Sequence, residues 1–231
     1  MRTLAIWVGA LALTGAAQAG PVVLTKLDDK QVLDSSTKLV WASDWNLAKT
    51  TGYASDGRMT WSESMAWIAK LNASNYAGHN DWRLASTNTT APSKCNESYN
   101  PGGGHADQYF GAFCSGSEMG HLFYEALGGK SGESVLNQAG DSAVEKANLA
   151  LFKNVQADFY WSATTFPPNS DYAWGFYTQF GGQYLTDRKD LYFALPVRAA
   201  DVSASVPEPQ TLALTLLALI GLTFVRRRRA A

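Results

Sequence analysis

The amino-acid sequence predicts an α+β fold with two helices and a small twisted antiparallel sheet. Three patterns support this class: an early pair of short β-rich runs, two stretches with apolar residues at helical spacing, and a final third in which short strands alternate with turns. The chain has 231 residues and carries a sorting pattern at each end, so we expect one domain with a sizeable core between them.

Residues 1–19 have the composition of a secretory signal peptide. Arg2 supplies a weak positive charge, residues 4–13 are apolar, and Ala17-Gln18-Ala19 forms a small-x-small cleavage site. We therefore expect export by the Sec machinery and cleavage between Ala19 and Gly20.

The first elements of the domain are a hairpin and a helix. Residues 32–41 place two β-rich runs around a polar turn, which predicts the hairpin. Thr60 and Glu63 have the spacing of a capping box, which predicts a helix over residues 60–72. The apolar residues that should form its buried face are Trp61, Met65, Ile68 and Leu71.

Residues 86–116 are polar and glycine-rich without a clear period, which predicts a long irregular loop. The two cysteines of the chain, Cys95 and Cys114, lie in this segment. In an oxidising compartment they most simply form one disulfide, worth about 3 kcal/mol in the chain-entropy model. A redox or nucleophilic cysteine is the alternative, but there is no Cys-x-x-Cys motif and no adjacent histidine.

A second helix should follow Ser117 and end at Gly128-Gly129. The residues expected on its inner face are Met119, Leu122, Phe123 and Ala126. After it we expect a β-meander with strands at 158–165, 172–180, 184–186 and 191–198. Pro196 predicts that the last of these strands lies at an edge or a bulge.

The C-terminus has a three-part pattern that follows a small and polar linker, residues 199–206. Its parts are Pro207-Glu208-Pro209, the uncharged apolar segment 212–225, and the cluster Arg226, Arg227, Arg228 and Arg229. The apolar segment would be about 21 Å long as a helix at roughly 1.5 Å per residue. It is shorter than an ordinary span, and the arginines would keep the C-terminus in the cytoplasm.

This pattern resembles the PEP-CTERM sorting signal of Gram-negative bacteria, which an exosortase, a membrane protease, recognises and cuts. The resemblance implies that residues 207–231 are a sorting signal whose transmembrane segment 212–225 holds the protein transiently in the inner membrane. Exosortase cleavage near Pro207 to Pro209 would then release the protein to the cell surface or extracellular matrix. An ordinary C-terminal membrane anchor is the alternative.

Three separated segments resemble the domain at the C-terminus of the Lcl collagen-like adhesin, a bacterial family of unknown function. These segments are Asp34-x-x-Thr37-x-Leu39-x-Trp41; Trp61 with Gly78-His79-Asn80-Asp81-Trp82-Arg83-Leu84; and Tyr160-Trp161-Ser162-Ala163-Thr164 with Ala173-Trp174 and Pro196-Val197-Arg198. Ala85 stands where the family usually has proline. The resemblance covers residues 24–201 and implies that residues 20–198 form a C-type-lectin-like domain with long irregular loops.

The most specific residues of this resemblance are interpreted as structural. Trp82 and Arg83 would brace the core, and Asp81 would pair with Arg83 or cap a neighbouring turn. Trp161 and Trp174 lie on alternating strands and are also expected in the core. The alternative makes Trp82 and Arg83 a platform and ionic clamp for a sugar.

Asn169, Asp171 and Tyr172, beside a Pro-Pro turn, are the ligand-binding candidates. A rigid loop tip with an aromatic face and polar acceptors suits the hydroxyl groups of a carbohydrate, although the same residue types also make ordinary turns. We expect ligand recognition to fall on this turn and on segment 86–116, and we expect the two to be neighbours.

Charge and motifs exclude several classes of partner. Of 19 basic residues, five lie outside residues 20–206 (Arg2 and the four terminal arginines), and of 20 acidic residues only Glu208 does, so this region has a net charge of −5. Without a basic patch, nucleic acid is not expected as a partner. The histidines lack zinc spacing, and neither a calcium-lectin triplet nor a cofactor fingerprint occurs, so no metal and no cofactor are predicted.

The sequence therefore predicts an exported, exosortase-processed protein of the surface or matrix, a non-catalytic binding or structural module associated with extracellular polysaccharide. A neutral or weakly charged glycan is favoured because of the net negative charge. The alternative is an extracellular enzyme with its site in loop 86–116, where His105 and Asp107 are the nearest acid–base pair. Its fold would be of the formylglycine-generating type, without the cysteine pattern of those enzymes.

Overall fold

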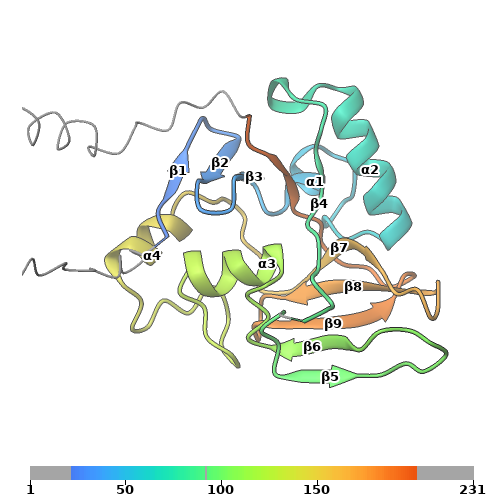
Figure 1. Ribbon diagram of the computed structural model, residues 1–231. Helices are drawn as coiled ribbons and strands as arrows, with labels where there is room; N and C mark the ends of the chain where they lie inside the picture. Colours follow the sequence, from blue (N-terminus) through green and yellow to red (C-terminus); the bar gives the residue numbers. More distant parts are fainter. Residues whose placement is uncertain (1–21, 92, 202–231) are drawn as a thin grey trace, which may run out of the picture.

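The computed structural model describes residues 22–91 and 93–201 (Figure 1). The predicted signal peptide, residues 1–19, and the sorting signal, residues 207–231, lie outside the described residues, as does most of the linker. Within the described ranges, two antiparallel sheets of five strands each dominate and the helices are few. None of the helices found there is long and apolar enough to cross a membrane.

The predicted fold class is therefore wrong. We expected an α+β, C-type-lectin-like domain with two helices and one small sheet, and a short apolar helix at its C-terminal end. The described chain is mostly β, because the segment predicted as a loop contributes two strands to a second full sheet. A clear C-type lectin fold with a C-terminal helix is not seen in the described residues.

The first sheet has the strand order β1-β2-β3-β10-β4. Its strands are β1 (Leu24–Lys26), β2 (Gln31–Asp34), β3 (Leu39–Ala42), β10 (Pro196–Ala199) and β4 (Arg83–Leu84). The predicted hairpin is confirmed as β2 and β3, in which Val32 pairs with Trp41. The apolar residues Val32, Leu39, Val40 and Trp41 are all buried, so this hairpin forms one wall of the core.

Strand β10 lies in the interior of this sheet and pairs without a register shift, so the prediction that Pro196 marks an edge or a bulge is wrong. Val197 pairs with Trp41 on one side and with Arg83 on the other. Proline is tolerated there because Pro196 is the first residue of the strand, where a missing N–H removes no bond from the ladder interior.

The second sheet has the strand order β5-β6-β9-β8-β7. Its strands are β5 (Glu97–Tyr99), β6 (Gln108–Ala112), β9 (Gly182–Asp187), β8 (Tyr172–Tyr177) and β7 (Phe159–Thr165). The predicted meander of the last third is confirmed for strands β7, β8 and β9. The prediction of an irregular loop over residues 86–116 is wrong, because this segment contains the β5–β6 hairpin. Parallel bridges from Ala85 to Ser162 and from Tyr160 to Phe193 join the two sheets around one core.

Helix α2 (Trp61–Ala73) confirms the predicted capping box, since Thr60 and Glu63 each bond the other's backbone N–H. Its buried face differs from the prediction: Met65 is 38% exposed and Trp61 is half-buried. The residues that do point inward are Ser64, Trp67, Ile68 and Leu71. The buried face of α2 is thus rotated from the predicted one toward Trp67, whose large side chain is completely buried.

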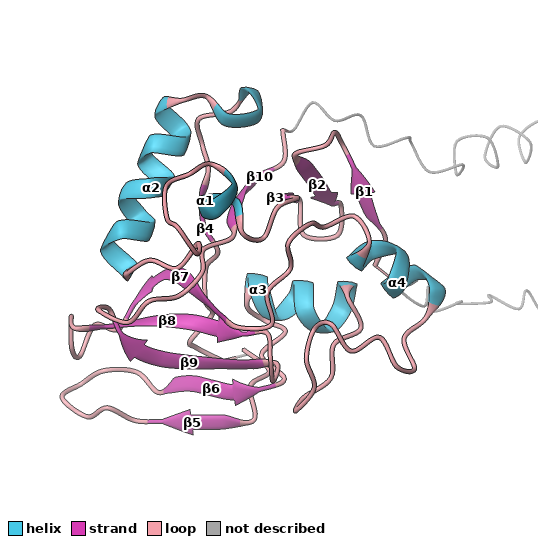
Figure 2. Cartoon of the chain, turned by 180° about the vertical axis from the view of Figure 1, so that it is seen from behind, coloured by secondary structure: helices cyan, strands magenta, loops and turns pink. Residues whose placement is uncertain are grey.

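The predicted second helix is present as α3 (Glu118–His121), which continues into a π-helical turn, η2 (Leu122–Ala126). All four residues expected on its inner face are buried, and Gly128 ends it with a φ of 72°. Two short helices were not predicted, α1 (Leu47–Thr50) and α4 (Ala143–Leu149), nor was the 3-10 turn η1 (Tyr76–Gly78). Seen from behind, α4 lies beside β1 while α2 lies near β4 (Figure 2).

Candidate functional site

Trp82, the most buried residue of the Asp81-Trp82-Arg83 motif, lies in the core and braces it. Trp82 is 2% exposed, and its indole N–H donates to the carbonyl of Tyr76 at 3.0 Å. The buried guanidinium of Arg198 lies 5.8 Å from the Trp82 ring and donates to the side chain of Gln31. A completely covered ring cannot serve as a platform for a sugar, so the contacts of Trp82 are those of a structural brace.

Arg83 pairs with Glu118 and not with Asp81, which corrects the expected ion pair. Two N–H groups of Arg83 each donate to a carboxylate oxygen of Glu118 at 2.7 Å, whereas Asp81 is exposed. The hydrogen bonds from Arg83 to Glu118 raise the pKa of the guanidinium, and the charge of the carboxylate adds to this effect. The pair joins β4 to α3.

Trp161 and Trp174 are both 1% exposed, within the core. The indole N–H of Trp161 donates to the carbonyl of Met59 at 2.8 Å. Trp174 packs edge-on against Phe166, with ring centroids 6.3 Å apart. The side chain of Trp174 also lines a cavity.

The predicted disulfide between Cys95 and Cys114 is confirmed. Cys95 precedes β5 and Cys114 follows β6, so the bond closes the base of the β5–β6 hairpin. The backbone N–H of Asn96 also donates to the carbonyl of Ala112 at 3.0 Å across this base. Both bonds fix the position from which the hairpin extends.

A cavity of about 300 Å³, which we call the aromatic groove, lies between the β5–β6 hairpin and the strands β8 and β9. It forms where β6 and β9 separate, since these strands pair only at Gly111 with Gln183 and at Ala112 with Gly182. Tyr99 is 55% exposed and Tyr184 is 38% exposed. The residues that line the groove are Tyr99, Gln108, Phe110, Trp174, Tyr184 and Leu185.

The side chain of Gln183 holds the two walls of the aromatic groove together. Its amide nitrogen donates to the carbonyls of Tyr109 at 2.9 Å and Asn88 at 3.1 Å, and its oxygen accepts from the hydroxyl of Ser117. Gln183 is fully buried. The hydrogen bonds of Gln183 therefore hold β9 to β6 at the point where the two walls of the groove meet.

The predicted ligand residues lie next to this groove but do not line it. The side-chain oxygen of Asn169 accepts from the backbone N–H of Asp171 at 2.9 Å, which is ordinary turn chemistry. Tyr172 is 38% exposed and stands two residues before Trp174, on the same face of β8. Of the three candidates, Tyr172 is thus the one best placed to contact a ligand that extends beyond the groove.

The start of segment 86–116 lies beside the end of strand β7, the strand that leads into the turn at 166–172. The backbone N–H of Thr87 donates to the hydroxyl of Thr164 at 2.9 Å, and that hydroxyl donates back to the carbonyl of Thr87. The hairpin of the same segment forms the opposite wall of the groove. Three lining residues, Tyr99, Gln108 and Phe110, thus come from the segment that the sequence analysis singled out, but none of them carries a motif that would identify it.

The acid–base pair considered for an enzyme is not formed in the described structure. The carboxylate of Asp107 accepts from the side-chain amide of Asn100 at 2.6 Å, and no hydrogen bond joins it to His105. Both residues are exposed at the tip of the β5–β6 hairpin. Among residues 22–91 and 93–201, no group of three or more acidic, histidine or cysteine side chains is arranged to hold a metal ion.

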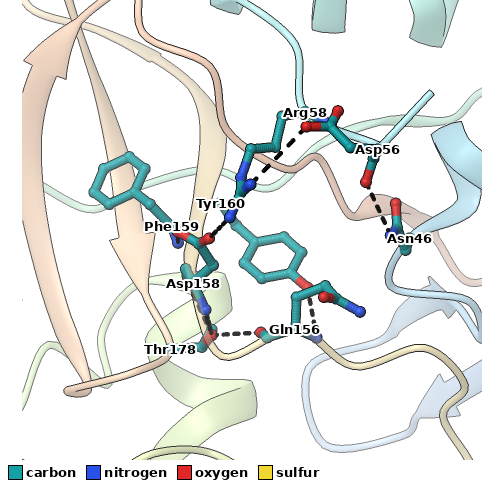
Figure 3. Close-up of polar contacts among 8 residues, drawn as sticks. All are labelled: Asn46, Asp56, Arg58, Gln156, Asp158, Phe159, Tyr160 and Thr178. Carbon is teal, nitrogen blue, oxygen red and sulfur yellow. Dashed lines mark hydrogen bonds and ion pairs between the residues drawn. The ribbon is translucent and has the colours of Figure 1, made fainter. Parts of the chain in front are cut away.

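A second cavity, of about 480 Å³, escaped the sequence analysis. We call it the polar pocket, and its lining residues are Asn46, Lys49, Thr50, Asp56, Arg58, Asn154, Gln156 and Phe193. They come from three stretches far apart in the chain, so no local pattern could have pointed to them. Figure 3 shows the polar contacts along one side of this pocket.

Comparison with known proteins gives one match. Residues 30–110 match the family model of the Lcl C-terminal domain, a stretch that contains the β2–β3 hairpin, α2 and the Trp82 and Arg83 brace. No curated protein and no solved structure matches the chain. The match is shorter than the expected resemblance over residues 24–201 and covers less than half of the chain. What is established is similarity to the Lcl C-terminal domain over residues 30–110.

Proposed function

We propose that the exported region is a non-catalytic module that binds extracellular polysaccharide in the aromatic groove. The observation that carries the proposal is the groove itself, in which the exposed rings of Tyr99 and Tyr184 accompany the amide of Gln108. A sugar ring has apolar C–H faces and hydroxyl edges. Aromatic rings pack against the former. The side-chain oxygen of Gln108 can accept from the latter, while its nitrogen donates to the carbonyl of Ala106 at 3.0 Å.

The lining of the groove favours a neutral glycan, because none of its six side chains is charged. A carboxylated or sulfated polymer would find no cation there and would meet the net negative charge of the exported region. The exposed ring of Tyr172, on the face of β8 that also carries Trp174, would extend the contact to a further sugar unit. Single-site affinity would be low, and repeated units of a polymer would compensate through avidity.

The two terminal signals give the module its proposed location. Removal of residues 1–19 and exosortase cleavage near Pro207 to Pro209 would leave it at the cell surface or in the extracellular matrix. A polysaccharide matrix is the material that a protein released there meets. The proposed ligand and the proposed location therefore agree.

The proposal is tested with the mature exported protein on an array of neutral and anionic glycans. Binding to a neutral glycan should weaken by roughly fivefold to tenfold in Tyr99→Ala and in Tyr184→Ala, since each ring contributes on the order of 1 kcal/mol. Phe180→Ala is the matched control, because Phe180 is 49% exposed and lies outside the groove. Unchanged affinity in both tyrosine variants would reject the groove as the site.

A further inference from the structure

The polar pocket has the organisation of a second binding site, which the proposed function does not use. Its walls differ from those of the aromatic groove, since seven of its eight lining residues are polar or charged and one, Phe193, is aromatic. At about 480 Å³ it is large enough for a small-molecule ligand.

A buried carboxylate arranges one wall of the pocket. Asp44 is 7% exposed, and its oxygens accept from the side-chain nitrogen of Asn154 at 3.0 Å and from the hydroxyl of Thr50 at 2.7 Å. The backbone N–H of Asn46 donates to it at 2.9 Å. One carboxylate thus fixes three lining residues from two distant segments, so this wall exists before any ligand arrives.

The other wall is held by Arg58 and the chain around Gln156 (Figure 3). Arg58 makes an ion pair with Asp158, and Asp56 lies 3.9 Å away from the same guanidinium. The backbone N–H of Gln156 donates to the hydroxyl of Tyr160 at 3.2 Å, and its carbonyl accepts from Thr178 at 2.9 Å. These bonds hold the backbone of Gln156 while its side chain stays at the pocket.

Several polar groups of the lining keep free hydrogen-bonding capacity. The side chain of Asn46 is not one of them, because it is 8% exposed and its oxygen, which has no hydrogen-bond partner among the described residues, is itself buried. That oxygen lies against Gly57, where an added Cβ would come within 1.6 Å of it, so only glycine leaves room for the amide. Within the described chain the ammonium of Lys49 has no ion pair, and Gln156 uses only its amide nitrogen, at 2.8 Å from the carbonyl of Asn154.

We propose that the polar pocket binds a neutral polyhydroxylated unit of the monosaccharide class. Its donors are Lys49 and Arg58, and its acceptors include the side-chain oxygen of Gln156 and the carboxylate of Asp56. Because charges of both signs lie around the pocket, neither an anionic nor a cationic ligand is favoured. Hydroxyl groups, which donate and accept, match such a lining. The assignment of a sugar as ligand rests on the proposed function.

Two sites of different character would let one domain hold two glycan segments. The aromatic groove would pack against the faces of sugar rings. The polar pocket would bind the hydroxyl-rich end or branch of another polysaccharide chain. A module of this kind links polymer chains, which a single-site module cannot do.

The test is a titration of the mature exported protein with free glucose, galactose, mannose and glucuronate, followed by NMR. At least one neutral sugar should bind more tightly than glucuronate. Its affinity should fall about tenfold in Lys49→Met and in Gln156→Ala, since each variant loses a hydrogen-bonding group. It should be unchanged in Lys146→Met, an exposed lysine of α4, and in Tyr99→Ala. Thermal melts should show that both pocket variants remain folded.

Each outcome separates the second site from the first. If none of the neutral sugars binds, or if Gln156→Ala and Lys49→Met bind as the parent does, the polar pocket is not a sugar site and the groove proposal still stands. Stronger binding of glucuronate than of every neutral sugar would also overturn the assignment. Loss of monosaccharide binding in Tyr99→Ala alone would place that sugar in the aromatic groove.

Discussion

The guanidinium of Arg83 and the carboxylate of Glu118 form a two-pronged ion pair, with both N–O distances at 2.7 Å. The same carboxylate accepts from the backbone N–H of Ser86 at 2.7 Å. Three parts of the fold thus meet at one side chain: strand β4, the first residue of segment 86–116, and helix α3. The sequence suggested a local partner for Arg83, but the real partner is distant in the chain.

Glu118→Gln should lower the free energy of unfolding by about 2 kcal/mol, because charged hydrogen bonds to Arg83 are weakened in a half-buried setting. Chemical denaturation measures the change. Asp81→Asn is the matched control and should change stability by less than about 0.5 kcal/mol, as expected for an exposed side chain. Equal losses in the two variants would contradict the pairing.

Trp82→Ala should cost about 3–5 kcal/mol, the usual loss when a large aromatic side chain is removed from a packed core. The indole hydrogen bond to Tyr76 and the contact with Arg198 would be lost as well. Tyr172→Ala, at an exposed ring, is the comparison and should leave the melting temperature nearly unchanged. A Trp82→Ala protein that melts like the parent would show that this tryptophan is not a brace.

Acid should destabilise the fold through Asp34, which is completely buried. Burial by itself raises the pKa of this carboxyl, but hydrogen bonds from His121 and Ser36 lower it by more, to about 2. Because the folded-state pKa is lower than the unfolded one, the stabilisation is complete above about pH 4 and is lost as the pH falls toward 2.

The contribution of Asp34 at neutral pH is roughly 2 kcal/mol, from about 1.4 kcal/mol for each unit of pKa difference. As the pH is lowered from 6 to 2, the free energy of unfolding should therefore decrease more steeply in the parent than in Asp34→Asn. Parallel pH profiles for the two proteins would disprove this role of Asp34.

Loss of the bond between Cys95 and Cys114 should lower stability by about 3 kcal/mol, because the unfolded chain regains the freedom of the closed loop. Denaturation with and without reductant measures the difference. The variant Cys95→Ala with Cys114→Ala controls for other effects of the reductant, to which it should not respond. Glycan binding should weaken at the same time, since the bond anchors the hairpin that carries Tyr99.

The terminal signals predict the ends of the mature protein. Mass spectrometry of the protein released by a host with an active exosortase should find Gly20 at the N-terminus. The C-terminus should fall near Pro207 to Pro209. Recovery of mature protein that still carries Arg226 to Arg229 would show that exosortase cleavage does not occur.

Local signals in the sequence predicted local structure well. The capping box of Thr60 and Glu63 marked the start of α2, and the apolar spacing after Ser117 identified the inner face of α3. Ser142 and Glu145 have the same capping spacing and do form a capping box at α4, so that helix could have been found from the same rule.

Features that depend on distant partners were not predicted. Strands β5 and β6 carry few alternating apolar residues, because β5 is an exposed edge strand and the hairpin is held by a disulfide at its base. The interior position of β10 depends on its pairing with β3 and β4, which Pro196 does not indicate. The polar pocket likewise depends on Asp44, whose carboxylate accepts hydrogen bonds from Asn154 and from Thr50 of α1. These residues are far apart in the chain, so no sequence pattern indicates that they meet.

The position of β10 also determines the order in which the protein can fold. The strand lies near the end of the described chain, yet it fills the gap between β3 and β4, which were made much earlier. A nascent chain must therefore keep two strand edges open until residues 196–199 have been synthesised, and such non-local pairing slows folding. A chain that stops before Pro196 cannot join β3 to β4, so the first sheet closes only when synthesis of the domain is nearly finished.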